Sequence, residues 1–113
     1  MKHDAAAASL AELGNTHRLG VFRFLVRAGH KGASVGEIQK SLGIPASTLS
    51  HHLSRMANVG LIRQERVGRT IMCIPVYAHL ESLIAYLHEE CCLGFEPEAF
   101  SRDGVAAPEQ GQQ

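Results

Sequence analysis

The sequence lacks the features that mark several large classes of protein. No apolar run approaches the length of a membrane span, and residues 1–5 do not begin the apolar core of a signal peptide. A Gly-rich phosphate loop, a Cys-x-x-Cys pair and a cofactor fingerprint are absent too, as are internal repeats. We therefore expect a cytoplasmic protein without a membrane partner or a constitutive cofactor. An enzyme, for instance a vicinal-dithiol reductase, is disfavoured.

Cysteine is scarce, with only Cys73, Cys91 and Cys92 among 113 residues. Because no secretion signal is recognised, we expect these thiols to be reduced, which makes them candidate ligands or sensors rather than structural disulfides. The length predicts one domain with a modest core, which is small enough to benefit from dimerisation.

The balanced net charge conceals two oppositely charged parts. Residues 1–80 carry ten Lys or Arg and four Asp or Glu, whereas residues 81–113 carry one Arg and seven acids. A net of +6 in the first part is compatible with nucleic-acid binding, provided that the acidic C-terminal part lies away from the nucleic acid.

Residues 44–56 have the pattern of a helix with one apolar face. Leu49, Leu53 and Met56 recur at i, i+4 and i+7, and Pro45 suits the first helical position. The opposite face is small, polar and free of acids, which favours close approach to base edges and phosphates. Its candidate DNA contacts are Ser47, Thr48, Ser50 and His51, with Arg55 on phosphate. His52 lies beside the apolar stripe, and we expect it to be a half-buried structural residue.

A second, shorter helix precedes this one. Ser34 and Glu37 form a capping-box pattern, Ile38 and Leu42 supply an apolar side, and Gly43 suits the residue after the helix end. A short helix, a Gly-containing turn and a second helix make a helix-turn-helix. Lys40 and Arg18 are further candidates for contacts to the DNA backbone.

The segments on either side complete a winged fold. Two helices are expected earlier, at residues 5–13 and from Asn15 or Thr16 to about Ala28, and the second has a wide apolar arc suited to the centre of the core. Residues 61–67 and 70–76 read as two strands joined at Gly68, with Pro75 closing the second strand at a sheet edge. Arg66 and Arg69 are the hairpin's candidates for phosphate or minor-groove contact.

A helical period returns after Val76. Tyr77, Leu80, Leu83, Ile84, Leu87 and Cys91 form one stripe. Since the core is complete without it, we expect this stripe to pack on the same helix and on the first helix of a second subunit. The predicted organisation is a flexible N-terminus at 1–9, one DNA-binding and dimerisation domain at 10–93, and a disordered acidic tail at 94–113.

These motifs, in this order, resemble the ArsR/SmtB family of winged helix-turn-helix repressors. The matching stretches are residues 13–19, 37–44, 47–53, 59–62 and 66–69, within a resemblance that covers residues 10–93. It implies a mainly α fold with a β-hairpin wing: three helices, the recognition helix, two strands and a C-terminal helix. It also implies a homodimer on double-stranded operator DNA. Two positions depart from the family: Ala46 stands where Gln is frequent, and Asn15 where Asp is usual.

Adjacent cysteines supply the sharpest chemical signal. Thiolates are soft ligands, so Cys91 and Cys92 are candidates for binding trivalent arsenic or antimony. The family's Cys-x-Cys site is absent, because those positions are Ser34, Val35 and Gly36. Other members similar to this sequence carry a cysteine pair at the end of the C-terminal helix, often followed by a third cysteine, which is missing here. The resemblance thus implies a repressor released by arsenite, by methylarsenite, or by antimonite, with the choice between inorganic and methylated arsenic left open.

Alternatives remain for both the ligand and the function. Cys73 is a candidate third ligand if the hairpin reaches the helix end. Zinc is a less favoured inducer, because His79, His88 and Glu89 or Glu90 supply the ligand types without the family's spacing. A thiol-redox or persulfide sensor would favour Cys73 paired with Cys91. A winged helix that binds protein instead of DNA is disfavoured by the arginines of the hairpin.

Overall fold

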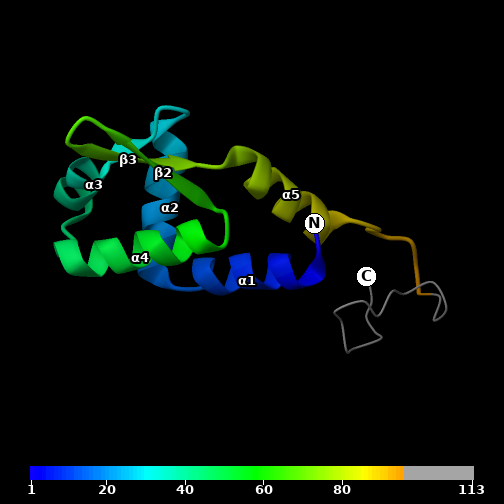
Figure 1. Ribbon diagram of the computed structural model, residues 1–113. Helices are drawn as coiled ribbons and strands as arrows, with labels where there is room; N and C mark the ends of the chain where they lie inside the picture. The colour runs from blue at the N-terminus through cyan, green and yellow to red at the C-terminus, as the bar shows by residue number, and fades with distance from the viewer. Residues whose placement is uncertain (96–113) are drawn as a thin grey trace.

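The computed structural model describes residues 1–95, a mainly helical fold with a small antiparallel sheet (Figure 1). In chain order the elements are α1 (His3–Leu13), α2 (Thr16–Ala28), β1 (Ala33–Ser34), α3 (Val35–Leu42), α4 (Ala46–Asn58), β2 (Ile62–Val67), β3 (Thr70–Pro75) and α5 (Tyr77–His88). The predicted winged helix-turn-helix is confirmed. Most of the predicted acidic tail, residues 96–113, lies outside the described residues.

The sheet contains one strand that the sequence did not predict. Its order is β1-β3-β2, so the two-residue β1 makes β3 the central strand. Ala33 pairs with Cys73, and Cys73 pairs on its other side with Gln64. Pro75, at the end of β3, pairs only with Ile62 of β2. The pairing between β1 and β3 has already ended before Pro75. The missing N–H of Pro75 therefore costs no hydrogen bond to β1.

The core forms where α2 meets the apolar faces of α3 and α4. The buried core residues are Val21, Phe22 and Leu25 of α2, Ile38 of α3, Leu49, Leu53 and Met56 of α4, Leu61, and Ile62 of β2. The predicted apolar stripe of α4 and the central place of α2 are both confirmed. His52, which is only 8% exposed, is buried with them more deeply than predicted.

Local hydrogen bonds fix the ends of the helix-turn-helix. The Ser34 hydroxyl accepts from the Glu37 N–H at 3.0 Å, and the Glu37 carboxylate accepts from the Ser34 N–H at 2.8 Å. Gly43 ends α3 in the left-handed region at φ 65°. The predictions for these residues are confirmed. The prediction for Pro45 is wrong by one residue, because Pro45 is the N-cap of α4 and the helix begins at Ala46.

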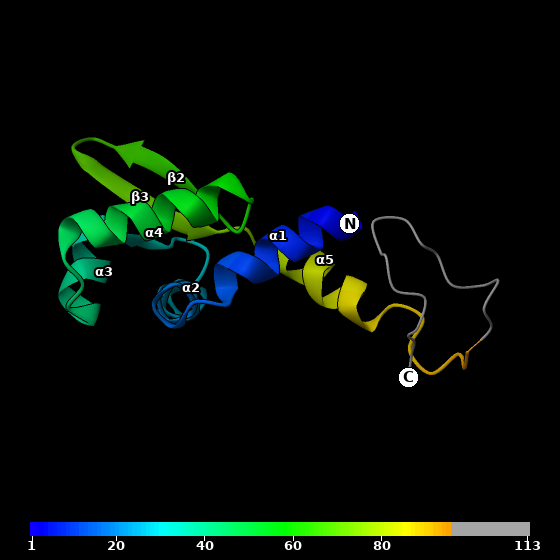
Figure 2. The same cartoon turned by 90° about the horizontal axis from the view of Figure 1, so that it is seen from below.

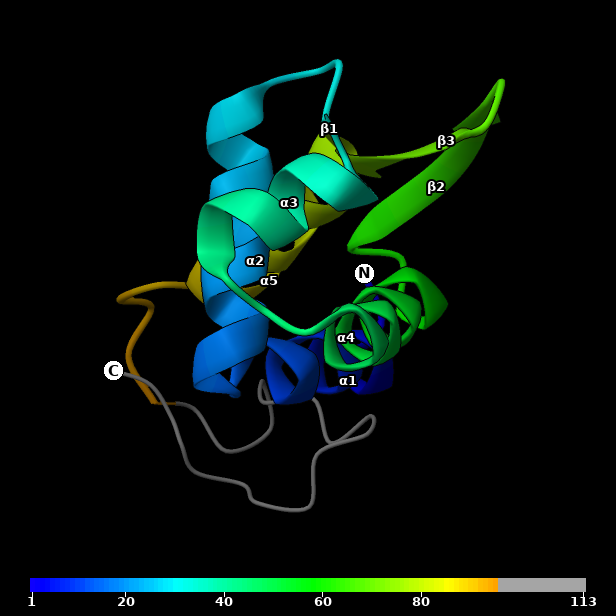
Figure 3. The same cartoon turned by 90° about the vertical axis from the view of Figure 1, so that its left-hand side faces the viewer.

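Helices α1 and α5 lie side by side and extend away from the helix-turn-helix and the sheet (Figures 1 and 2). The β2–β3 hairpin projects in another direction, as Figure 3 shows. Two predicted limits need correction. α1 begins at His3 and not at Ala5, so helix extends into the segment that the sequence placed outside the domain. α5 ends at His88, so Cys91 does not continue its helical stripe.

Candidate DNA-binding face and thiol site

The outer face of α4 presents the predicted small polar residues to solvent. Ser47, Thr48, Ser50 and His51 are all exposed, while Leu49 and Leu53 beneath them are buried. The buried side chains hold the helix against the core and leave short hydroxyls and one imidazole outward, where the helix can enter a major groove without steric obstruction.

Two of the hairpin's arginines extend this surface. Arg66 and Arg69 are exposed and lie either side of Gly68, whose φ of 65° provides the tight tip. Neither forms an ion pair with any residue in the 1–95 range. Arg63 differs, because it pairs with Glu65 at 3.0 Å. Arg66 and Arg69 are therefore the hairpin arginines available for phosphate.

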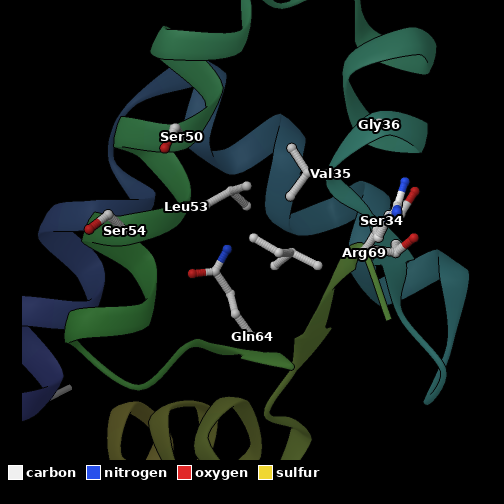
Figure 4. A pocket seen from close by; sticks show the side chains of 10 residues that line it. Ser34, Val35, Gly36, Ser50, Leu53, Ser54, Gln64 and Arg69 are labelled. Atoms are coloured by element: carbon white, nitrogen blue, oxygen red, sulfur yellow. The ribbon is translucent and has the colours of Figure 1, made fainter. Parts of the chain in front are cut away.

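A cleft of about 540 Å³ separates the hairpin from α4 and the start of α3 (Figure 4). Leu53, Val35 and Gln64 point into it, and Ser50 of α4 and Arg69 of the hairpin belong to its lining. Recognition helix and wing thus flank one hollow, an arrangement in which both can contact the same duplex.

Cys91 and Cys92 lie in turns beyond the end of α5, with both side chains exposed. Glu90 and Cys92 have positive φ, 63° and 68°, and this turn places the two Sγ atoms 3.0 Å apart. The hydrogen bond with Cys92 is the main cause that raises the pKa of the Cys91 thiol, and partial desolvation adds to it. The pair is thus held as two contacting thiols exposed to solvent, and the raised pKa of Cys91 disfavours its thiolate form.

Cys73 occupies a different environment. It is fully buried in β3, where the Gln64 amide donates a 3.6 Å hydrogen bond to Sγ, and burial raises the pKa of its thiol. Over residues 1–95 no three His, Cys, Asp or Glu side chains lie close enough together to hold a metal ion. One chain therefore brings Cys91 and Cys92 together but gathers neither Cys73 nor the histidines of the zinc alternative with them. His79 instead bonds Ser9 through Nε2 at 2.7 Å.

Comparison with known proteins assigns the family. A family model described as a helix-turn-helix domain matches residues 13–65. The transcriptional regulator YgaV of Escherichia coli, described as HTH-type, is 33% identical over 89 residues, which cover 79% of this chain and 88% of YgaV. The chain belongs to the helix-turn-helix transcriptional regulators.

Solved structures share the regulator's winged fold. An ArsR-like regulator from Rhodococcus sp. RHA1 has a TM-score of 0.68 at 22% identity and covers 76% of this chain and 78% of its own. The homodimeric domain of Mb0332 from Mycobacterium bovis has a TM-score of 0.60 at 24% identity, over 77% and 81% of the chains. The repressor BigR from Xylella fastidiosa has a TM-score of 0.59 at 28% identity, over 78% and 87%. No helix in the described part of the regulator is long and apolar enough to span a membrane.

The structure also gives roles to residues for which sequence reasoning found none. Glu12 of α1 binds the guanidinium of Arg55, a predicted DNA contact, and His3 bonds the Tyr86 hydroxyl at 2.6 Å. These pairs are separated by 43 and 83 residues. Nothing in the local sequence indicates that their side chains meet, because the contacts depend on how α1 packs.

Proposed function

We propose that this regulator is a dimeric ArsR/SmtB-type repressor that releases its operator when trivalent arsenic binds Cys91 and Cys92. The family assignment, the ArsR-like fold and the exposed dithiol support this proposal. The observation that carries it is the 3.0 Å contact between the two Sγ atoms on the surface.

Operator recognition is assigned to the outer face of α4 and to the hairpin. The short side chains of Ser47, Thr48, Ser50 and His51 contact base edges and nearby phosphates, and Arg66, Arg69 and the exposed Lys40 contact the backbone. Ala46, also exposed, offers only a methyl group where a polar side chain would add a hydrogen bond. Arg55 is not counted among the phosphate contacts, because Glu12 holds its guanidinium.

The dimer is assigned to α1 and α5. Leu10 of α1 and Ile84 and Leu87 of α5 are 41%, 56% and 61% exposed, on two helices that lie side by side. A second copy would cover these side chains, as expected for an apolar surface on a soluble DNA-binding chain. Mb0332, which shares this fold, is a homodimer. Two copies of α4 can then occupy successive major grooves of a pseudo-palindromic operator.

The inducer is a trivalent arsenical, inorganic or methylated, and antimonite is the closest chemical analogue. Each thiol forms one S–As bond and displaces one hydroxide from arsenic as water, so two thiols leave one position on arsenic. In arsenite that position keeps its hydroxide or exchanges it, as water, for a small thiol, and in methylarsenite it already carries the methyl group. Zinc fits less well, because closed zinc sites use four protein ligands and the described part of the chain gathers no third one here.

Ligand binding is expected to act through the helix pair. Cys91 and Cys92 follow α5 by a few residues, and Tyr86 in the last turn of α5 contacts His3 of α1. Closing both thiols on one arsenic reshapes this end of the dimer helices and thereby the spacing of the two α4 helices. A coupling of about 1–3 kcal/mol, or about 5–150-fold in operator affinity, is sufficient for a switch.

The test is operator release by the full chain and by three cysteine variants. Fluorescence anisotropy of an operator duplex is followed during titration with arsenite, methylarsenite, antimonite or Zn²⁺. We expect an arsenical to weaken binding by about 5–150-fold for wild type and for Cys73→Ala, and to have no effect on Cys91→Ser or Cys92→Ser. The Cys73 variant is the matched control, because it removes a thiol that lies outside the pair.

The other outcomes separate the alternatives. Release by Zn²⁺ alone that survives both Cys91→Ser and Cys92→Ser would identify a zinc-responsive repressor. Release by an oxidant or a persulfide, with no response to arsenicals, would identify a thiol-redox sensor. Salt-independent or absent DNA binding would favour a winged helix that binds protein.

A further inference from the structure

Three helices of the regulator meet at the carboxylate of Glu12. This residue lies near the end of α1 and its side chain is only 12% exposed. Arg55, in the second half of α4, donates to it twice, from Nε to Oε1 at 2.8 Å and from Nη2 to Oε2 at 3.2 Å. Arg18 of α2 lies 3.1 Å from Oε1 through Nε, which also donates to the Glu12 carbonyl oxygen at 2.7 Å.

This arrangement has the geometry of a specific link and not of a chance surface pair. The bidentate Arg55–Glu12 contact fixes both planar groups, and Arg18 Nε also approaches Oε1 while it donates to the Glu12 carbonyl oxygen. Hydrogen bonding from Arg55 lowers the pKa of the Glu12 carboxyl, so the carboxylate remains charged at neutral pH. The three groups therefore hold α1, α2 and α4 in one relative orientation.

α1 needs such a link because it contributes little to the core. Its buried residues are Ala6 and Ser9, which are small, and Leu13 is partly buried against the main cluster. With so little apolar area, the direction of α4 relative to α1 depends strongly on polar contacts. Glu12 is also placed where the proposed dimer helix meets the recognition helix.

We propose that Glu12 is a positioning residue that sets the orientation of the recognition helix relative to the dimer helix through Arg55. Arg55 thus acts within the protein and not on DNA phosphate. A displacement of α1 caused by ligand or by the partner subunit is transmitted to α4 by this ion pair. The inference rests on operator binding by α4 as proposed above, and it does not depend on which inducer the cysteines bind.

The salt dependence of binding separates positioning from phosphate contact. An arginine on phosphate contributes about one to the slope of log affinity against log salt concentration, whereas an intramolecular arginine contributes nothing. The test uses a duplex that the wild-type full chain selects from a random-sequence library. Affinity is measured by anisotropy at several KCl concentrations for Glu12→Gln, Arg55→Ala, Arg55→Lys and Glu12→Gln/Arg55→Ala.

If Glu12 positions α4, each single variant weakens operator binding by about five-fold or more with an unchanged salt slope. The double variant is then no weaker than Arg55→Ala, because both changes break the same link. Arg55→Lys also weakens binding, since one ammonium cannot replace the two-pronged contact. Glu89→Gln, which removes an exposed acid from the turn after α5, is the matched charge control and should bind like wild type when no inducer is present.

Two results would overturn the inference. One is a slope lowered by about one in Arg55→Ala with binding retained in Arg55→Lys, which would place Arg55 on phosphate. The other is wild-type affinity for Glu12→Gln. Circular dichroism melting of each variant gives the folded fraction at the assay temperature, and affinities are expressed per folded chain. If the wild-type chain selects no duplex, the proposed operator binding fails instead.

Discussion

At the scale of single residues, His52 is the most unusual group in the recognition helix. It is buried, and its Nδ1 has no hydrogen-bond partner among residues 1–95. Its ring stacks on that of His17, with centroids 6.1 Å apart and planes 10° apart. Burial is the main cause that lowers the pKa of His52, and the charges of Arg18, His17, His51 and Arg55 lower it further. The folded protein therefore holds His52 neutral.

This environment predicts that the protein loses stability in mild acid. In the unfolded chain His52 takes up a proton near its ordinary pKa of about 6.5, whereas in the folded chain uptake is delayed to lower pH. As the pH falls from the unfolded-state pKa toward the lower folded-state pKa, the unfolded state binds more protons than the folded state. The free energy of unfolding therefore falls with pH over this interval. We expect His52→Phe to reduce the loss between about pH 7.5 and about pH 5.5 in urea denaturation.

The control for this prediction is His88→Phe, which removes an exposed histidine from the end of α5. It should keep the wild-type dependence on pH, apart from any constant offset. Glu12 also faces this cluster through its pairs with Arg18 and Arg55, and its pKa is lowered, so its protonation affects stability only at more acidic pH. Equal pH dependence of wild type and His52→Phe would refute the assignment to His52.

At the scale of elements, β1 shows how the hairpin is attached to the helices. Gly32 just before it has φ +71°, and a Cβ there would overlap the Cys73 carbonyl oxygen and lie 2.9 Å from Ile74 Cγ1. Gly29 also has positive φ, +92°, but a Cβ there would meet nothing within 4 Å. Substitution of Gly29 would therefore test backbone strain alone, whereas substitution of Gly32 would test backbone strain together with a steric clash against β3.

We expect Gly29→Ala to lower the free energy of unfolding by about 1–3 kcal/mol from backbone strain alone, because φ 92° with ψ −167° is a conformation that essentially only glycine adopts. Gly32→Ala should lower it by more than about 3 kcal/mol, because the strand must also move away from β3. Urea denaturation of both variants measures the difference. Equal losses would mean that the Gly32 backbone shifts freely and that β1 does not constrain the hairpin.

Elements with local signals could be predicted from the sequence, and elements that depend on distant partners could not. Local residue types predict the ends of these elements. The Ser34–Glu37 capping box marks the start of α3, Gly43 marks its end, and Gly68 marks the hairpin turn. The two-residue β1 has no period of its own and exists because β3 is beside it. The apolar pattern in the sequence predicts a helix that reaches Cys91, but α5 ends at His88 and the chain then turns.

The candidate site divides in the same way. The exposed residues of α4 follow from a helical period, and the neighbouring thiols follow from adjacency in the sequence. The ion pair between Arg55 and Glu12 could not be predicted in this way, because no sequence pattern relates two charged residues that are 43 positions apart. Likewise, the burial of Cys73 depends on β1, which covers it from a part of the chain where no strand was expected.

At the scale of the whole molecule, the DNA-binding part and the pair of helices α1 and α5 are separate parts of the structure. The helix-turn-helix and the hairpin lie on one side, and α1 and α5 extend to the other with Cys91 and Cys92 beyond the end of α5. Polar contacts join α1 to α5 at Ser9–His79 and His3–Tyr86, and join α1 to α4 at Glu12–Arg55. α1 is thus the element through which the helices of the proposed dimer interface and the recognition helix are connected.

The proposed dimer predicts a strong effect of one charge on the exposed face of α5. Leu87→Glu would place a carboxylate in an apolar interface, and we expect at least about a tenfold weaker dimer, equivalent to about 1.4 kcal/mol. Sedimentation velocity over a concentration series measures the change. Val67→Glu, at a hairpin residue of similar exposure, 59% against 61%, is the matched control and should sediment as wild type does.

The same variant links assembly to DNA binding. Two half-site contacts joined in one dimer act together, so a monomer should bind the full operator much more weakly than wild type while binding a single half-site about equally well. Comparing the two duplexes by anisotropy separates loss of assembly from damage to α4. If Leu87→Glu remains dimeric and binds the full operator as wild type does, the interface does not include this face of α5, and the cysteines at its end would need another route to the recognition helix.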